Sequence, residues 1–343
     1  MLSKSWKKIF IALSLAVVLF LATVLFIFYI DNIKNSESFD FYISKNEKLE
    51  VVLTNLKENK ILKSEFSFRQ AATILSYNDQ KIKPGKYIIS PGMNNYQLIS
   101  KLRSGKQDPI KLSINNVRDI YQLCGRLGNS LMEDSMSFVQ LFTDSLFLDS
   151  LGYKPETVLS LFIPDTYEMY WTVSPRKIAD RFQKEHDNFW SKNGRKQAIA
   201  DQQLTEVQAY TLASIVEKET LVDKEKATIA GVYLNRLKQN MKLQADPTVV
   251  FALGLFGIQR ILFEHLHTPS PYNTYVNTGL PPGPIYMPSI ASLEAVIHPE
   301  KHDYIFFCAK PGYEGTHSFA VNLQGHAINA NAYRDWLNKE NIK

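Results

Sequence analysis

Cysteine is scarce in this chain of 343 residues, which has only Cys124 and Cys308. Two cysteines so far apart exclude a disulfide-stapled scaffold and leave either one bridge or, as we expect, two buried free thiols. The sequence also lacks the H-E-x-x-H, G-x-S-x-G, P-loop and G-x-G-x-x-G motifs. Zinc, hydrolase-elbow, nucleotide and dinucleotide chemistry therefore have no local support, and we expect no cofactor.

Basic tracts are also missing. The formal charge of +5 comes from 39 Lys plus Arg against 34 Asp plus Glu, and three of the cations lie within the first eight residues. No basic run is interleaved with aromatic residues, so nucleic acid is excluded as a partner. The seven histidines suggest a metal, but Pro299 after His298 disfavours a helical pair with His302. We expect hydrogen-bonded or solvated histidines and no metal site.

One long apolar run dominates the N-terminus. Residues 9–30 carry no charge, and a helix of that length spans about 33 Å, enough to cross a membrane. A cleaved signal peptide usually has a shorter apolar region followed by small residues, which are missing here. Lysines precede the run and acids balance lysines after it, so we predict a cytoplasmic tail over 1–8, a transmembrane helix over 9–30, and everything from Asp31 outside the cytoplasm. The predicted location is the cytoplasmic (inner) membrane, with lipid as a partner.

After this anchor the pattern indicates two domains. Residues 39–105 are predicted as strand, helix, helix and strand, followed by a helix capped at Asn94 or Asn95. A second region begins with a strand near residue 110 and continues with amphipathic helices over 118–131 and 137–153. The overall fold class is α+β.

The clearest helix covers 204–220, with Thr205 as its N-cap. Ser214 and Glu217 share a face that carries small residues, which leaves room for a ligand, and Glu219 borders the apolar stripe. Either glutamate fits a catalytic acid with a raised pKa. The alternative is that both are ordinary ion-paired glutamates, and the pattern alone leaves this open.

Three other positions have competing interpretations. Arg236, at the polar edge of the next helix, fits either a partner of one glutamate or a solvated cation. Asp246 before Pro247 is sufficiently explained as a helix N-cap. Asn273 lies in a Pro-led turn, where turn formation and substrate contact are equally good explanations.

Six short motifs together carry a resemblance to a known family. The chain resembles the YceG-like endolytic murein transglycosylases in ASIVEKET (213–220), NRL (235–237), LQADPTV (243–249), PYNTY (271–275), GLPPGPI (279–285) and GTHSF (315–319). The resemblance implies a one-pass anchor, a LysM-like module over 39–105 and a mixed α/β catalytic domain over 110–343.

The resemblance also implies an activity. The enzyme would be a lytic transglycosylase that cleaves the β-1,4 bond between N-acetylmuramic acid and N-acetylglucosamine inside nascent peptidoglycan strands, ends them as 1,6-anhydro sugars and so terminates elongation. Glu217 is the implied catalytic acid and base, and peptidoglycan synthases are implied partners. The implied substrate-binding residues are Ser214, Glu219, Asn235, Gln244, Asp246, Tyr272, Asn273, Tyr275 and His317.

Two alternatives from other classes stay open. One is a non-catalytic peptidoglycan-binding scaffold of the wall-synthesis machinery, and the other is a metal-dependent wall hydrolase that uses the histidines. A scaffold does not need a catalytic carboxylate, so an intact one favours an enzyme. Activity that persists in the presence of a chelator would exclude the metal-dependent hydrolase.

Overall fold

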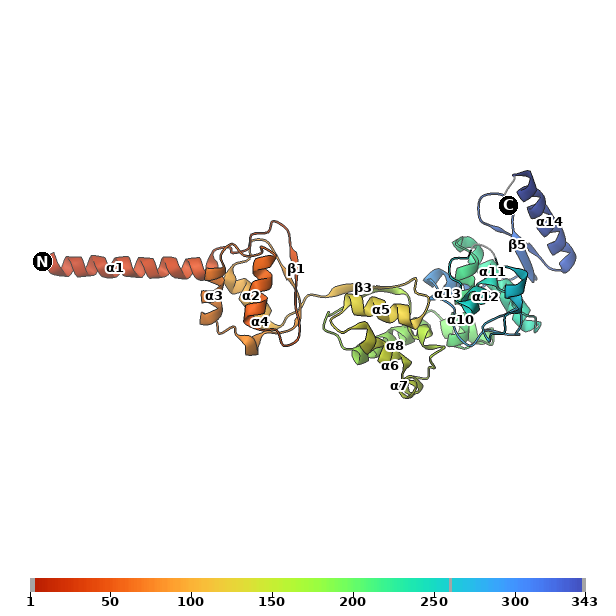
Figure 1. Cartoon of the computed structure of the whole chain (residues 1–343), viewed down its shortest axis with the longest axis horizontal. Coiled ribbons are helices and arrows are strands. Elements are labelled where there is room, and N and C mark those ends of the chain that lie inside the picture. Colours follow the sequence, from red (N-terminus) through yellow and green to blue (C-terminus); the bar gives the residue numbers. More distant parts are fainter. Residues whose placement is uncertain (1–3, 259–260, 341–343) are drawn as a thin grey trace. The chain divides into compact units, whose positions relative to one another are not determined.

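The computed structural model in Figure 1 describes residues 4–258 and 261–340. The chain forms two compact units, Met1–Lys111 with Glu168–Val173, and Leu112–Tyr167 with Ser174–Lys343. The described residues combine helices with three two-stranded sheets. The predicted mixture of helix and strand is confirmed. The finer divisions at 39–105 and 110–343 stay predictions.

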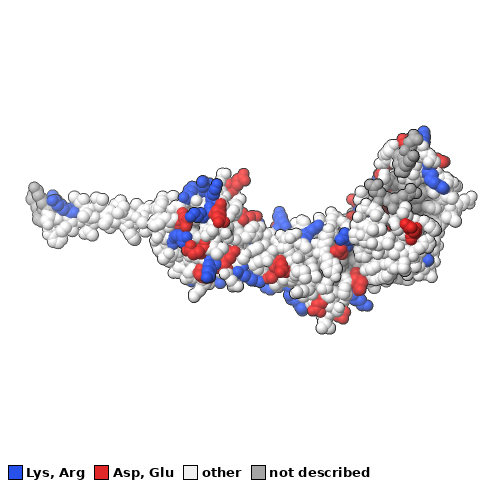
Figure 2. Space-filling view, viewed as in Figure 1, with Lys and Arg blue, Asp and Glu red and all other residues white. Residues whose placement is uncertain are grey.

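The first unit begins with a long apolar helix. Helix α1 (Lys4–Val24) continues into the π-helical turn η1 (Leu25–Tyr29). The span Ser5–Tyr29 is long and apolar enough to cross a membrane, which agrees with a single-pass anchor. Figure 2 shows this segment as an uncharged surface beyond its N-terminal lysines. Residues 1–3 of the predicted tail lie outside the described residues.

The rest of the first unit has the predicted order of strand, helix, helix and strand. Phe39 pairs with Ile89 and Ile43 with Gly85 in its antiparallel sheet. Asn94 caps the following helix in a capping box, which confirms one of the two predicted caps. The elements are β1 (Phe39–Ile43), α2 (Leu49–Glu58), α3 (Glu65–Ile74), η2 (Asp79–Lys81), β2 (Gly85–Ile89) and α4 (Asn95–Ser104).

The second unit is mainly helical. The predicted helix over 137–153 is wrong as one element, because Asp144 ends one helix and accepts from the amides of Leu146 and Phe147 to start another. Strands β3 (Ile110–Ile114) and β4 (Asp165–Met169) pair in one sheet, and each begins in one unit and ends in the other. The remaining elements are α5 (Ile120–Ser130), α6 (Ser135–Thr143), α7 (Ser145–Ser150), η3 (Val158–Leu161), α8 (Pro175–Ser191), α9 (Arg195–Asp201), α10 (Glu206–Glu219), α11 (Asp223–Lys238), α12 (Asp246–Leu253), η4 (Phe263–His267), α13 (Ile290–Ile297), β5 (Phe306–Ala309), β6 (His317–Ala320) and α14 (Leu323–Lys339).

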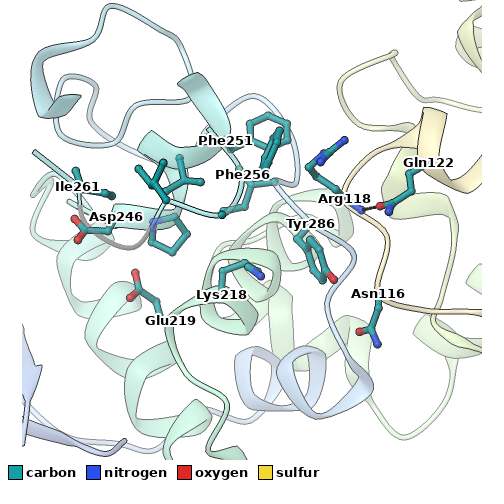
Figure 3. A pocket seen from close by; sticks show the side chains of 15 residues that line it. Asn116, Arg118, Gln122, Lys218, Glu219, Asp246, Phe251, Phe256, Ile261 and Tyr286 are labelled. Carbon is teal, nitrogen blue, oxygen red and sulfur yellow. Dashed lines mark hydrogen bonds between the residues drawn. The ribbon is translucent and has the colours of Figure 1, made fainter. Parts of the chain in front are cut away.

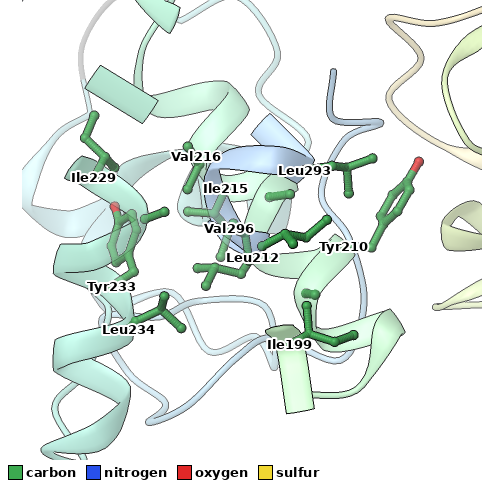
Figure 4. Packing of buried hydrophobic residues seen from close by; sticks show 14 of the residues in the cluster. Ile199, Tyr210, Leu212, Ile215, Val216, Ile229, Tyr233, Leu234, Leu293 and Val296 are labelled. Carbon is green, nitrogen blue, oxygen red and sulfur yellow. The ribbon is translucent and has the colours of Figure 1, made fainter. Parts of the chain in front are cut away.

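Helix α10 lies at the centre of the second unit. Thr205 caps it in a capping box, as predicted. Figure 4 shows its side chains Leu212, Ile215 and Val216 packed among residues of α9, α11 and α13. Residues 209–216 are buried on all sides, and the C-terminal turn, residues 217–219, emerges from this core.

Both cysteines are free. Cys124 is buried in α5, where burial raises the pKa of its thiol to about 12, and Cys308 is half-buried on β5. The expectation of free thiols is confirmed, although Cys308 is less buried than predicted.

Candidate active site

The two glutamates at the end of α10 have opposite environments. Residues two apart on a helix point in directions about 200° apart, so Glu217 and Glu219 cannot share one face. Glu217 lies against α11 and α13, whereas Glu219 lines a cavity. The residue pattern left either one as the acid, and the family resemblance implied Glu217; the surroundings of the two carboxyl groups distinguish them.

Glu217 is held as an anion. Its Oε2 accepts from the Ser289 amide at 3.0 Å, and from the hydroxyls of Ser289 and Ser292 at 2.5 Å each. The buried Lys226 ammonium lies 3.2 Å from the same oxygen. Burial opposes ionisation, but the serine hydrogen bonds and Lys226 outweigh it and lower the pKa of Glu217. The carboxylate therefore anchors the N-terminus of α13.

The surroundings of Glu219 favour its protonated form. Burial is the largest cause that raises its pKa, to about 7, and the nearby Asp246 acts in the same direction. The Tyr233 hydroxyl donates to Glu219 Oε1 at 2.5 Å and, with Arg236, limits the rise. A carboxyl group of this pKa is partly protonated near neutral pH, which suits proton donation to a leaving group.

The cavity beside Glu219 has a volume of about 490 Å³, in the size range of small-molecule sites. Figure 3 shows Glu219 and Asp246 together at one end and Arg118, Gln122 and Asn116 at the other. The Arg118 guanidinium lies 3.9 Å from the centre of the Phe256 ring. The walls thus combine polar groups with apolar faces, the combination that sugar rings require. The lining residues are Asn116, Arg118, Gln122, Lys218, Glu219, Asp246, Pro247, Val250, Phe251, Phe256, Gly257, Ile258, Ile261, Ile285 and Tyr286.

Asp246 does not cap α12. Ala245 occupies the N-cap position and Asp246 is the first helical residue, so the predicted cap is wrong by one position. Its Oδ1 instead accepts from the Tyr275 hydroxyl at 2.6 Å. Asp246 is therefore left at the cavity wall, and Tyr275 from the PYNTY motif orients it.

Ser214 has a structural place. Its hydroxyl donates to the Thr211 carbonyl at 2.7 Å and accepts from the Ile285 amide at 3.0 Å. The room expected for a ligand on this face of α10 is therefore filled by the segment that carries Ile285, and that expectation is wrong.

The NRL motif also forms structural contacts. The Asn235 amide donates to the carbonyls of His302 and Tyr304. Arg236 is buried and donates to the carbonyls of Ile305 and Leu243. Its predicted place at a polar edge is wrong, because these two carbonyls replace its hydration.

The other predicted ligands lie around the site without lining the cavity. The buried Asn273 amide donates to the carbonyls of Leu266 and Thr268, which supports the turn interpretation. Tyr272 packs on Phe251 of the cavity wall at 4.8 Å between ring centres. Gln244 is exposed and donates its backbone amide to Thr274.

His317 is paired with a carboxylate away from the cavity. Its Nδ1 lies 3.1 Å from Glu225 Oε2 and its backbone amide donates to Glu225 Oε1. Within the described ranges, 4–258 and 261–340, no group of three His, Cys, Asp or Glu side chains is placed to hold a metal ion.

Sequence reasoning missed the far wall of the cavity. Asn116 and Arg118 come from the loop between β3 and α5, and Gln122 from the first turn of α5, about a hundred residues before the end of α10; no local motif marks them. Lys218, between the two glutamates, was not predicted as a site residue; its Nζ lies 4.5 Å from the centre of the Tyr286 ring. Only the folded chain brings these residues together.

Comparison with known proteins decides the family. The model of the YceG-like family matches residues 41–332, most of the chain. The chain belongs to the YceG-like family. Its EKET, ADPT and PYNTY segments, which carried the resemblance, supply Glu219, Asp246 and Tyr275 of the site described above.

The chain is similar to named proteins and to a solved structure. The endolytic murein transglycosylase of Bacillus subtilis (strain 168) is 28% identical over 303 residues, 83% of this chain and 81% of the relative. That of Streptococcus pneumoniae serotype 2 (strain D39) is 26% identical over 317 residues, 84% of this chain but only 57% of the relative. The crystal structure of a yceG-like protein from Listeria monocytogenes has a TM-score of 0.56 and 30% identity, and covers 86% of this chain and 99% of that one.

Proposed function

We propose that this YceG-like chain is a membrane-anchored lytic transglycosylase that cuts the muramic acid to glucosamine bond inside peptidoglycan strands and leaves 1,6-anhydro ends. The observation that carries the proposal is Glu219, a carboxyl group with a pKa raised to about 7 on the wall of a cavity of sugar-binding size. The names of the relatives agree with a transglycosylase acting on murein.

Glu219 has the chemistry of a lone acid and base. Protonated, it would donate to the glycosidic oxygen as positive charge develops at the sugar C1; ionised, it would accept the proton of the muramoyl C6 hydroxyl, which closes on C1. Ordinary glycosidases need a second carboxylate for water or for a covalent adduct. Asp246, at the same end of the cavity, would stabilise the positive charge without attacking it.

The proposal assigns the role of catalytic acid to Glu219. The family resemblance had suggested Glu217 for that role. A residue that accepts several hydrogen bonds on one oxygen and has a lowered pKa is a poor proton donor near neutral pH. Glu217 would instead position the segment that carries Ile285 and Tyr286 of the cavity wall. Both assignments are open to direct test.

The rate of cleavage should depend on pH through Glu219. Because the acid form is needed, activity should fall above pH 7. The Tyr233 hydrogen bond lowers the pKa of Glu219, so Tyr233→Phe should shift this limit to higher pH. Tyr210→Phe is the matched control, since its hydroxyl donates to the Phe162 carbonyl in the same core. Equal pH profiles for Tyr233→Phe and the unmodified protein would contradict the assignment.

We also propose that the chain spans the inner membrane with its catalytic region outside the cytoplasm. The lysines before residue 9 favour a cytoplasmic N-terminus. A reporter fused after Lys343 should be active only outside the cytoplasm, and the protein should stay in the membrane fraction. A cytoplasmic reporter, or mature protein released after Tyr29, would contradict this.

The experiment that tests the function uses purified glycan strands and the full-length chain in detergent. An endolytic enzyme should release internal fragments from strands of many disaccharides and shorten them at random. A scaffold should bind the strands and leave their length unchanged. Loss of activity on addition of a chelator would favour the metal-dependent hydrolase.

A further inference from the structure

The apolar helix enters the core of the module that follows it. Ile27, in η1, is buried in the same hydrophobic cluster as Phe68 and Ile99 of α3 and α4. The cluster contains residues from both strands of the module as well. The end of the anchor and the module are therefore one packed body.

Buried amides reinforce this junction. Asn95 Nδ2 donates to the Ile27 carbonyl at 2.7 Å and to Ser67 Oγ at 3.0 Å. Asn32 Nδ2 donates to Asn95 Oδ1 at 2.7 Å, and Asn32 Oδ1 accepts from the Ser64 amide. These bonds tie residues on both sides of Tyr29 to α3 and α4. Such a buried network fixes orientation, because a buried polar group left without a partner destabilises the fold.

The length of the apolar run places this junction at the membrane surface. About 20 helical residues cross the hydrocarbon core. Counted from Ile9, directly after Lys8, the crossing ends at about residue 28. Ile27, which already belongs to the core of the module, thus lies at the outer boundary of the bilayer. No length of chain remains to separate the module from the lipid.

The outer face of α3 fits a lipid interface. Its exposed positions are Phe66, Gln70, Thr73 and Ile74, none of which is charged. Phe66 and Ile74 are 65% and 60% exposed. Figure 1 shows α3 at the end of the module that α1 enters, and β1 at the opposite end.

The residues around the outer face of α3 also fit a lipid interface. The Tyr96 ring at the start of α4 stacks on Tyr29 at 6.3 Å, and aromatic rings of this kind favour the headgroup region. The Glu65 carboxylate, next to Phe66 in the sequence, pairs with Arg69 and Lys57. Pairing reduces the cost of placing these charges next to headgroups.

We propose that the outer face of α3, with Tyr29 and Tyr96, is a lipid-binding surface that rests in the headgroup region of the outer leaflet. The inference depends on the proposed membrane anchor and is independent of the catalytic assignment. This contact holds the module at a fixed distance from the bilayer. The module can then bind only material that lies within one module length of the membrane surface.

Spin labels on the full-length chain in phosphatidylcholine/phosphatidylglycerol vesicles test this. Single cysteines replace Phe66, Ile74, Tyr42 and Leu15 in a Cys308→Ala parent. The buried Cys124 should not react with the spin label, and treating the parent itself with the label checks this. Tyr42, 41% exposed on β1, is the matched control at the far end of the module. Collision with oxygen, which dissolves in lipid, is compared with collision with a water-soluble nickel chelate.

Labels at 66 and 74 should show an oxygen-to-nickel ratio several-fold above that at 42 and below that at 15. Equal, water-like ratios at 66, 74 and 42 with a lipid-like ratio at 15 would overturn the surface and leave the anchor intact. A water-like ratio at 15 would overturn the anchor itself. Labels that are water-like in vesicles but shielded in native membranes would identify a protein partner and overturn the lipid proposal.

Discussion

Glu219→Gln is expected to reduce the rate of glycan cleavage by about 10²–10⁴-fold, the usual contribution of a general acid and base. Gln keeps the shape of the side chain and its place at the cavity wall but cannot exchange a proton. Since Glu219 is the carboxyl group with the raised pKa at this site, no neighbour is poised to replace it. The measurement is initial rate on purified strands at pH 6, with folding checked by circular dichroism.

Glu217→Gln is the matched variant in the same helical turn. Because Glu217 binds serines and Lys226 away from the cavity, the folded fraction of this variant should retain activity within about tenfold of the unmodified protein. If Glu217→Gln abolishes cleavage in a folded protein while Glu219→Gln remains active, the assignment of the acid is reversed. That outcome would restore the role suggested by the family motif.

The second large effect concerns stability. Glu217→Gln should lower the free energy of unfolding by about 3 kcal/mol, because it directs an amide or a weaker acceptor toward two serine hydroxyls and removes an ionic partner of the buried Lys226. Asp223, 2.8 Å from Lys226, limits the loss. Thermal unfolding in detergent measures it, and Glu219→Gln is the control, since its neutral amide resembles the protonated acid.

The sign of the pH dependence follows from the lowered pKa of Glu217. Its contribution to stability is present above the pKa of an unfolded glutamate, about 4.3, and is lost as the pH falls through the lower pKa of the folded state. Glu217→Gln should therefore flatten the acid side of the stability profile. An unchanged melting temperature together with an unchanged acid limb would show that the hydrogen bonds to Glu217 do not support the fold.

Local patterns predicted much of the fold. The apolar run, the β1-α2-α3-β2 order and the caps at Asn94 and Thr205 each depend on neighbouring residues, and the structure contains all of them. Asp144 was missed as a cap inside an apolar stretch because hydrophobic periodicity continues across it. The burial of Arg236 was not predicted because both of its partners are backbone carbonyls. The Ile305 carbonyl is distant in sequence, and the Leu243 carbonyl belongs to an irregular segment.

The site was harder to predict because it depends on directions and tertiary neighbours. The sequence identifies two glutamates separated by one lysine, and nothing in their order says which of them meets α13. Ser289 and Ser292, which donate hydrogen bonds to the Glu217 carboxylate, are more than seventy residues away in the sequence. Tyr233, which donates to Glu219, is on another helix. Burial raises the pKa of Glu219 against its bond from Tyr233, whereas the serines and Lys226 outweigh burial and lower that of Glu217.

Mass analysis of the ends of released fragments tests the central claim most directly. Purified, undecorated glycan strands are incubated with the full-length chain, and the new ends are compared with those left by a hydrolase. If the C6 hydroxyl closes on C1, every new muramic end is a 1,6-anhydro sugar, lighter by one water than the hydrolytic product. Reducing ends that incorporate labelled oxygen from solvent water would contradict this account and would assign Asp246 the role of a second catalytic carboxylate.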